Sequence, residues 1–375
     1  MEPTGKKIVY VVNVDWFFIS HRLPLALHAL AIGYKVYVIT KDTGRFAEME
    51  AIGLKCIPLD FERSGRNPVK EFKLIFHLKK IYLHLIPDII HHITLKPSIY
   101  GTTAARKAKS KAIIINAVSG LGYTFTGNRI SVSKMILVGL MRIAFLKKTS
   151  RFIFQNPDDR AFYEKQHFLN ASNNLIIKGS GVDENVFVQK NYEITSGKIR
   201  VVLVARMLKD KGILEFIRAA ESLQTKYADK IEFILVGGLD LHNPAHITQK
   251  EIESHTKGGL IKWMGHRTDV KEIYTSADIV CLPSYREGLP KSLVEAMAIG
   301  CPIITTDTIG CRDCVDEGVN GYLVPVGNHV LLAQRIETLA LDRELRIQMG
   351  NHSRLKMVKE MSLSQVIKMT FELYA

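Results

Sequence analysis

Two glutamates in the last third of this sequence have the type and spacing that a ligand site requires. Glu287 lies just before a Gly-Leu-Pro turn, and Glu295 lies eight residues later inside an apolar helical run. A carboxylate only accepts hydrogen bonds, so its natural partners are hydroxyl groups or cations. Considered alone, the pair has an equally good structural explanation, in which Glu287 is solvated and Glu295 stabilises the helix dipole.

The turn between the two glutamates predicts an anion site. Pro290 suits the first turn of a helix, where a missing N–H has no cost. Residues 279–283 form an apolar run that ends in proline, which is typical of a short buried strand. Free backbone N–H groups are therefore expected near residues 289–292, at the strand end where open parallel sheets bind ligands. Carboxylates on both sides of an anion site suit a ligand with central phosphates and hydroxylated rings, such as a nucleotide sugar.

A second loop of the same kind carries basic residues. An apolar run at residues 199–205 predicts a strand, and Arg206 and Lys211 follow it before the next helix. In a parallel sheet this loop and residues 285–291 lie on the same edge. Alone, the two cations would be an ordinary surface pair. Beside a helix start they can hold a diphosphate without a metal ion and stabilise charge on a departing oxygen. No plausible Asp-x-Asp metal motif accompanies them, and we expect no metal site and no cofactor.

The elements that position these loops form two α/β series. A length of 375 residues predicts two domains of about 180 residues each. Strand-like runs alternate with helical runs, which indicates doubly wound α/β domains. The predicted strands are residues 7–13, 35–40, 54–59, 88–92, 112–116, 152–155 and 174–177, then 199–205, 233–238, 261–267, 279–283 and 302–306. A polar stretch at residues 189–198 marks the linker, so we expect a first domain at 1–190 and a second that begins at 199.

The net charge of +14 is concentrated in the first half of the chain. Residues 1–200 carry 30 Lys and Arg against 15 Asp and Glu, a net +15, whereas the remainder has a net charge of −1. Residues 89–157 contain eleven basic residues and no acid. The first half is therefore expected to meet a polyanion: a nucleic acid, an anionic membrane or a phosphorylated acceptor.

A membrane-spanning helix is not expected, because the chain has no run of about 20 apolar residues. The amino terminus leads directly into a strand and does not resemble a secretory signal. The apolar segment at residues 131–148 is edged with basic residues. It is either a core helix or a helix that lies on a membrane surface.

The loop at residues 13–22 is not glycine-rich, so it is no dinucleotide fingerprint. Aromatic residues beside His21 and Arg22 either bind an anionic, partly apolar ligand or pack the loop. The five cysteines include one C-x-x-C, Cys311 and Cys314, without a second pair or clustered histidines. We interpret the cysteines as reduced structural thiols.

Five motifs together resemble family 4 of the retaining glycosyltransferases, which have the GT-B fold of two Rossmann-like domains facing a central cleft. They are Arg206-x4-Lys211-Gly212, Val236-Gly237-Gly238, Gly265-His266-Arg267-x-Asp269-Val270, Glu287-Gly288-Leu289-Pro290-x4-Glu295-Ala296 and Gly318-x-Asn320-Gly321-x-Leu323-Val324-Pro325. The resemblance spans nearly the whole chain and is strongest in residues 199–325. Residues 116–123 and 242–245 are similar to those of bacterial enzymes that act on undecaprenyl-diphosphate-linked acceptors.

The resemblance implies a role for each matching residue. Arg206 and Lys211 would neutralise the donor diphosphate, and Glu287 would contact the transferred sugar. Glu295 would bind the ribose hydroxyls. The other implied donor-binding residues are Gly237, His266, Arg267, Gly288, Leu289, Pro290 and Lys291. Residues 199–355 would form the nucleotide-sugar domain, and a helix at residues 356–375 would cross back to the first domain.

Two departures from the family pattern lie in the first half. Many members have a glycine pair in the first loop, where this chain has Asp15-Trp16-Phe17, and a histidine near the position of Ser119. We expect the acceptor to be bound in this half, with His21, Arg22, Ser119 and Gly120 as candidate residues.

These observations predict a cytoplasmic enzyme that is peripheral on the inner face of the bacterial plasma membrane. It would move a hexose or N-acetylhexosamine, with retention, from a UDP-sugar to a polyprenyl-diphosphate-linked saccharide. The expected partners are the nucleotide-sugar donor, the lipid-linked acceptor and an anionic membrane surface, with no nucleic acid. The alternatives are a GT-B sugar-nucleotide epimerase and, in a different class, a basic nucleic-acid-binding protein, for which no aromatic-basic RNA motif or recognition helix is present.

Overall fold

The computed structural model describes residues 5–61, 68–120, 132–146, 149–170, 172–192, 197–241, 243, 245–259 and 261–375. The chain divides into two compact units, Met1–Ser180 with Val366–Ala375 (unit 1) and Gly181–Gln365 (unit 2). This division comes earlier in the chain than the predicted linker. The segment from Gly181 to the predicted linker belongs to unit 2. Val182 pairs there with Ser362, and the Val182 N–H donates to the carbonyl oxygen of Met361 at 3.2 Å. Motif residues 121–123, 147–148, 242 and 244 lie outside the described residues.

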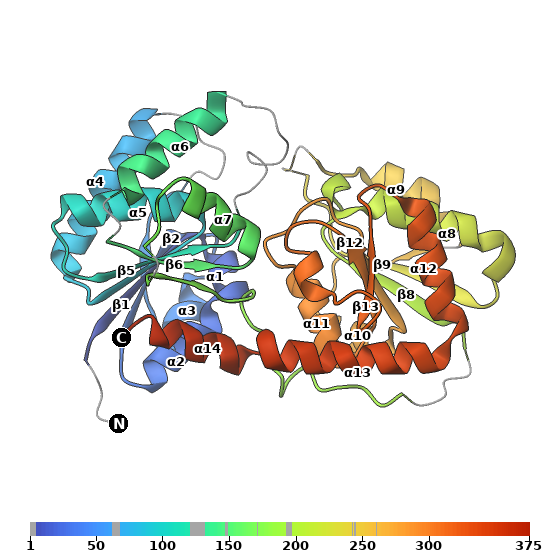
Figure 1. The fold of residues 1–375 in the computed structure, drawn as a ribbon. Helices are drawn as coiled ribbons and strands as arrows, with labels where there is room; N and C mark the ends of the chain where they lie inside the picture. The colour runs from blue at the N-terminus through green and yellow to red at the C-terminus, as the bar shows by residue number, and fades with distance from the viewer. Residues whose placement is uncertain are drawn as a thin grey trace. The chain divides into compact units, whose positions relative to one another are not determined.

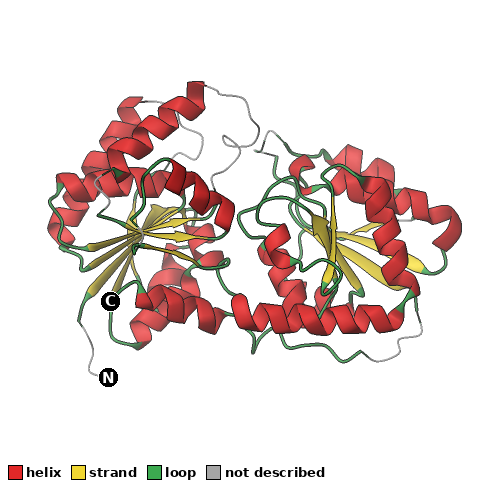
Figure 2. Ribbon diagram, in the orientation of Figure 1, coloured by secondary structure: helices red, strands yellow, loops and turns green. Residues whose placement is uncertain are grey.

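Unit 1 contains a parallel seven-stranded sheet with the order β3-β2-β1-β4-β5-β6-β7 (Figure 2). Its strands are β1 (Lys7–Val14), β2 (Lys35–Lys41), β3 (Lys55–Pro58), β4 (Ile89–Ile93), β5 (Ile113–Val118), β6 (Arg151–Phe154) and β7 (Asn174–Ile176). All seven predicted strands of the first series are present, within two residues at each end. They are recognisable because strands buried on both faces are continuous apolar runs.

Helices cover both faces of the unit 1 sheet (Figure 1). Along β1, Ile8 and Tyr10 join a core that includes residues of α2, whereas Val9 and Val11 join another that includes residues of α4 and α5. The alternation follows from the two-residue period of a strand. The helices are α1 (Asp15–His21), α2 (Leu23–Ala31), α3 (Phe46–Ala51), α4 (Pro68–Leu85), α5 (Leu95–Lys107), α6 (Val132–Phe145) and α7 (Pro157–Lys165).

The last ten residues complete the core of unit 1. Val366, Leu373 and Tyr374 join the apolar cluster that contains β1. The Tyr374 hydroxyl lies 2.8 Å from His91 Nδ1 and 3.1 Å from the Tyr10 hydroxyl, and all three side chains are buried. Buried polar groups of this kind stabilise a fold when they are paired and destabilise it when a partner is removed.

Replacing Tyr374 tests this contribution. We expect Tyr374→Phe to lower the free energy of unfolding by about 1–2 kcal/mol, because the hydroxyl of Tyr10 and Nδ1 of His91 lose a buried hydrogen-bond partner. Chemical denaturation followed by tryptophan fluorescence measures the change. The control is Tyr37→Phe, whose partly exposed ring lies on β2. Equal stability of both variants would contradict the prediction.

Unit 2 contains a parallel six-stranded sheet with the order β10-β9-β8-β11-β12-β13. Its strands are β8 (Ile199–Val204), β9 (Ile231–Val236), β10 (Ile261–Trp263), β11 (Ile279–Leu282), β12 (Ile303–Thr306) and β13 (Gly321–Val324). Its α-helices are α8 (Ile213–Tyr227), α9 (Gln249–Thr256), α10 (Val270–Ser276), α11 (Lys291–Ile299), α12 (His329–Leu341), α13 (Arg343–Glu360) and the first turn of α14 (Leu363–Glu372). Two short 3-10 helices, η2 (Lys209–Lys211) and η3 (Arg312–Cys314), lie in its loops.

Two strands of unit 2 differ from the sequence prediction. The expected strand at 261–267 ends at Trp263, because Gly265 has φ +65° and turns the chain. β13 was not predicted as a strand, because only four residues pair and they begin with a glycine. Within the described part of the chain, no helix is both long and apolar enough to cross a membrane.

Candidate active site

The sequence-predicted donor loops meet at the switch point of the unit 2 sheet. β8 pairs with β9 on one side and with β11 on the other, and both pairings are parallel. After β8 the chain continues to β9 on one side, and after β11 it continues to β12 on the other side. Ligands of doubly wound folds bind in the crevice at such a point. Arg206 and Lys211 follow β8, and Glu287 follows β11.

A cavity of about 320 Å³ opens at this edge. Fourteen residues line it, and eight of them are predicted site residues, namely Arg206, Lys211, Gly237, His266, Arg267, Glu287, Pro290 and Lys291. The volume lies within the range of small-molecule sites. We refer to it as the donor cavity. Gly288, Leu289 and Glu295 do not line it directly.

Glu287 is held by the two groups that face its carboxylate. Lys211 Nζ lies 2.5 Å from Glu287 Oε1, and both side chains are about 15% exposed. The hydroxyl of Ser284 lies 3.0 Å from the same oxygen and 2.9 Å from the carbonyl oxygen of Asp210. Ser284 is fully buried. The hydroxyl fixes the orientation of the carboxylate and ties the β11 loop to the β8 loop.

The second cation of the cavity is more exposed than the first. Arg206 Nη1 lies 2.5 Å from Asp240 Oδ2, and the arginine side chain is 46% exposed. Asp240 lies on the loop that follows β9. Since an exposed ion pair contributes little to stability, Arg206 can exchange this partner for an anionic ligand at small cost. Arg267 is likewise exposed and bound to Asp269 at the rim.

Glu295 lies within α11, one helical turn after the first residue of the helix. Burial raises the pKa of its carboxyl group, and the neighbouring Lys291 partly offsets this. Lys291 Nζ lies 3.6 Å from Glu295 Oε1, one helical turn away. Pro290 is the N-cap, and no side chain of the described residues caps this helix. Its amide groups and the two cations together make the cavity suitable for an anion, while the carboxylates can accept hydrogen bonds from hydroxyl groups.

Two close backbone approaches hold the floor of the cavity. Gly237 has φ +149°, and a Cβ there would lie 1.7 Å from the carbonyl oxygen of Ala205. At Gly310, with φ +80°, a Cβ would lie 2.4 Å from the carbonyl oxygen of Glu287. Only glycine fits at these positions. The sequence pattern identified Gly237 but gave no indication of Gly310.

Cys311, Cys314, Cys281 and Cys301 are buried and Cys56 is half-buried, and none of the five forms a disulfide. Burial, followed by the nearby charge of Glu287, raises the pKa of the Cys311 thiol to about 12. A thiol with such a pKa is protonated and unreactive at neutral pH. This agrees with the interpretation of the cysteines as structural thiols.

The candidate acceptor residues lie in unit 1, after β1 and β5. His21 stacks on Phe17, with ring centroids 4.1 Å apart. Arg22 is 3% exposed, and its Nη1 donates to the carbonyl oxygen of His21 at 3.0 Å. Burial lowers the pKa of Arg22 to about 10, so it stays charged at neutral pH. A direct contact between Arg22 and a ligand would require this side chain to become exposed.

Ser119 and Gly120 follow β5 and are half-buried. The Ser119 hydroxyl and Asn13 Oδ1 are buried without a hydrogen-bond partner among the described residues. Asn13 Nδ2 donates to the Thr94 hydroxyl at 3.1 Å, and Thr94 has φ +73°, an unfavourable conformation for a β-branched residue. Because β1, β4 and β5 are neighbours, these residues share one sheet edge. Unpaired polar atoms and backbone strain are features of ligand sites.

Comparisons with known proteins agree with this geometry. The family "Glycosyl transferases group 1" matches residues 185–356, and "Glycosyl transferase 4-like" matches residues 7–156. The N,N'-diacetylbacillosaminyl-diphospho-undecaprenol alpha-1,3-N-acetylgalactosaminyltransferase of Campylobacter jejuni is 30% identical over 333 residues, which cover 85% of each chain. This chain is a family 4 glycosyltransferase. The resemblance in its motifs is thereby confirmed.

Further relatives of this glycosyltransferase are more distant. The UDP-Gal:alpha-D-GlcNAc-diphosphoundecaprenol alpha-1,3-galactosyltransferase of Escherichia coli is 23% identical over 316 residues, covering 82% of this chain and 80% of that one. The capsular polysaccharide biosynthesis glycosyltransferase CapM of Staphylococcus aureus is 25% identical, covering 97% and 95%.

Solved structures confirm the GT-B fold. A glycosyltransferase from Rickettsia africae has a TM-score of 0.80 at 17% identity, covering 99% of this chain and 98% of that one. HepE of Anabaena, solved in complex with UDP-glucose, has a TM-score of 0.73 at 18% identity, covering 98% of both chains. At these identities the likeness concerns the fold alone.

The sequence did not reveal Ser284, which contacts Glu287 in the wall of the donor cavity, and its role can be tested. We expect Ser284→Ala to lower kcat at least about tenfold while KM for the donor changes less, because Glu287 loses the hydroxyl that orients its carboxylate. Steady-state kinetics measure the split between the two constants. Ser222→Ala on the exposed side of α8 is the control, since its hydroxyl bonds only to its own helix. Unchanged kcat in Ser284→Ala would contradict the assignment.

Proposed function

We propose that this glycosyltransferase moves a hexose or N-acetylhexosamine from a UDP-sugar to a polyprenyl-diphosphate-linked saccharide, with retention of the anomeric configuration. The observation that carries the proposal is the donor cavity, in which two cations and a helix start lie beside Glu287. A UDP donor is supported by HepE, whose structures contain UDP and UDP-glucose. The C. jejuni and E. coli relatives are both named for diphospho-undecaprenol acceptors.

The donor would bind with its diphosphate between Arg206, Lys211 and the first amides of α11. When the bond between the sugar and the diphosphate breaks, the leaving oxygen gains negative charge, and these groups stabilise it. Glu287 would accept hydrogen bonds from hydroxyls of the transferred sugar. Glu295 would accept them from the ribose. Glu295 can accept these hydrogen bonds as a carboxylate although burial raises its pKa, because the hydroxyl donors and the Lys291 charge favour the ionised form.

A cavity of unit 1 offers groups that suit the acceptor. It measures about 480 Å³ and lies between the end of β3, the first turns of α4 and Lys96. Its lining contains the lysines Lys73, Lys80 and Lys96 and the acids Asp60 and Glu71. Lys96 Nζ lies 2.6 Å from Glu71 Oε1, so Lys73 and Lys80 are the cations that would meet a diphosphate. Apolar side chains lie among them, so the wall can contact both a diphosphate and the beginning of a prenyl chain. The unpaired atoms of Asn13 and Ser119 would bind hydroxyls of the acceptor saccharide.

Helices α4 and α6 expose apolar side chains as well as basic ones, and both pack on α5 (Figure 1). On α4 the exposed apolar residues include Phe72, Phe76 and Leu83. On α6 and directly after it they are Met135, Ile136, Ile143 and Leu146. Exposed apolar groups interspersed with Lys and Arg favour attachment to an anionic membrane, where a lipid-linked acceptor resides.

Transfer assays test the proposed reaction. We expect the folded enzyme to transfer sugar from at least one UDP-sugar of a panel to undecaprenyl-diphosphate saccharides, with chromatography of the lipid product as the readout. Glu287→Ala and Lys211→Ala should each lower kcat/KM about 100-fold or more, because each removes a group that acts on the reacting sugar or the leaving diphosphate. Glu221→Ala on the surface of α8 is the control.

Three results would contradict the proposal. They are an absence of transfer with every UDP-sugar and GDP-sugar tested, near-normal activity of either site variant, and conversion of the donor without any acceptor. Proton NMR of donor and enzyme alone detects the last of these, which would indicate an epimerase. The configuration of the new bond, read from the proton NMR spectrum of the isolated transfer product, tests retention.

Membrane attachment has its own test. Phe72→Ser combined with Ile136→Ser should lower binding to vesicles that contain phosphatidylglycerol at least about tenfold, because two exposed apolar anchors are lost. Co-sedimentation measures binding, and transfer to a short-chain, water-soluble acceptor should stay unchanged. The control is Leu341→Ser, an exposed apolar residue of α12 in unit 2. Equal binding of both variants and the wild type would show that α4 and α6 are not the contact.

A further inference from the structure

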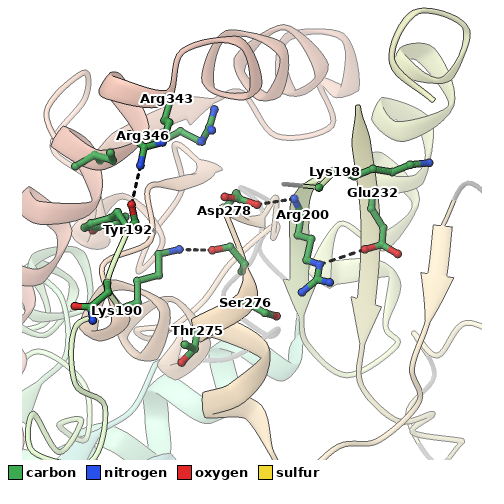
Figure 3. A pocket seen from close by; sticks show the side chains of 14 residues that line it. Lys190, Tyr192, Lys198, Arg200, Glu232, Thr275, Ser276, Asp278, Arg343 and Arg346 are labelled. Atoms are coloured by element: carbon green, nitrogen blue, oxygen red, sulfur yellow. Dashed lines mark hydrogen bonds and ion pairs between the residues drawn. The ribbon is translucent and has the colours of Figure 1, made fainter. Parts of the chain in front are cut away.

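Figure 3 shows the side chains that line a second cavity of unit 2. It lies at the beginnings of β8, β9 and β11, whereas the donor cavity lies at the ends of these strands. It measures about 460 Å³. Its wall includes Arg200 and Glu232 near the beginnings of β8 and β9, Asp278 just before β11, and Arg343 at the beginning of α13. The remaining wall comes from residues 190–192, 197–198, 275–277 and 346–347. A cavity of this size accommodates a small ligand.

The charges that line this cavity do not cancel. Five lining residues are basic (Lys190, Lys198, Arg200, Arg343 and Arg346), and two are acidic. Both acids contact the same basic residue, Arg200. Glu232 Oε2 lies 3.4 Å from Arg200 Nε, and Asp278 Oδ2 accepts the backbone N–H of Arg200 at 2.9 Å. Three positive charges therefore remain in excess among the described lining residues.

The other four cations are held mainly by neutral carbonyl oxygens. Lys190 and Lys198 donate to the carbonyl oxygens of residues 277 and 228, which end α10 and α8. Arg346 Nη1 donates to those of residues 339 and 340 in the last turn of α12, at 2.6 and 2.9 Å. A helix end carries only about half a negative charge, so these contacts leave a positive surplus.

Helix capping explains three of these cations but not Arg343. Its Nη2 donates at 2.7 Å to the carbonyl oxygen of Tyr192, which belongs to a loop. Among the described residues, its one carboxylate contact is with Glu344, 3.4 Å away, whose side chain is 86% exposed. Arg343 and Arg346 stand three residues apart at the beginning of α13, where like charges repel each other. An anion bound between the two guanidinium groups would remove this cost.

We propose that this cavity binds a small phosphorylated anion with at least two negative charges, at a site separate from the donor cavity. Two guanidinium groups and the ammonium group of Lys190 supply directed hydrogen bonds to phosphate oxygens. The cavity and the donor cavity lie at opposite ends of the same strands, β8 and β11. The binding does not depend on the proposed transfer reaction.

Calorimetric titration with inorganic pyrophosphate tests the site. Pyrophosphate bound in the donor cavity or in the unit 1 cavity contributes equally to all variants below, so the second cavity is observed as the binding that its own variants lose. We expect the wild type to bind pyrophosphate, and Arg343→Gln to weaken one class of its binding sites at least about tenfold, since one charged partner of the anion is lost. Chloride at equal ionic strength should produce no comparable heat.

Two further variants complete the test. Arg160→Gln on α7 of unit 1 removes an exposed arginine elsewhere and should bind pyrophosphate as the wild type does. Lys198→Gln removes an exposed cation of the cavity, and it should weaken binding if Arg343→Gln fails to fold. The proposal is overturned by an absence of pyrophosphate binding to the wild type. It is equally overturned if the folded cavity variants bind as tightly as Arg160→Gln.

Discussion

The donor cavity depends on the parallel pairing of β8 with β11. This pairing brings the two loops that follow the strands to one edge of the sheet, although 76 residues separate Lys211 from Glu287 in the chain. The 2.5 Å ion pair between these side chains and the hydroxyl of Ser284 then fix the loops to each other. The close approach of Gly237 to the β8 loop shapes the neighbouring wall. The side chains of the cavity depend on one another, because contacts between the β8 loop and the β11 loop fix the backbone that carries them.

Much of this arrangement could be predicted from the sequence, for a physical reason. Buried parallel strands are continuous apolar runs, and residues directly after them must share an edge, so Arg206, Lys211 and Glu287 could be placed together before any coordinates were known. The partners of these side chains could not. Asp240 contacts Arg206 and Ser284 contacts Glu287 because loops fold back in space, and neither spacing nor residue type records such a path. β13 was not predicted because a strand of four residues that begins with glycine is too short to show the alternation of apolar and polar residues.

The two units differ in what they present to a ligand. Unit 2 combines a nearly neutral composition with localised cations, as expected for a cavity that must select one nucleotide. Unit 1 contains the acid-free residues 89–157 and the exposed apolar side chains of α4 and α6. A diffuse charge attracts a surface, whereas a few buried cations recognise a molecule. Under the proposed function, the split in charge along the sequence would correspond to a division between locating a lipid-linked substrate and activating a soluble one.

The position of the last ten residues has a consequence for synthesis on the ribosome. Val366, Leu373 and Tyr374 belong to the core around β1, yet they are translated after all of unit 2. Unit 2 is contiguous and can close its core before translation ends. The strands of unit 1 are synthesised first, but Tyr10 and His91 lack their hydrogen-bond partner until Tyr374, which follows α14, has been synthesised. The nascent first half therefore has an open apolar edge for the whole time that the second half is made, and it is the part that chaperones would need to protect.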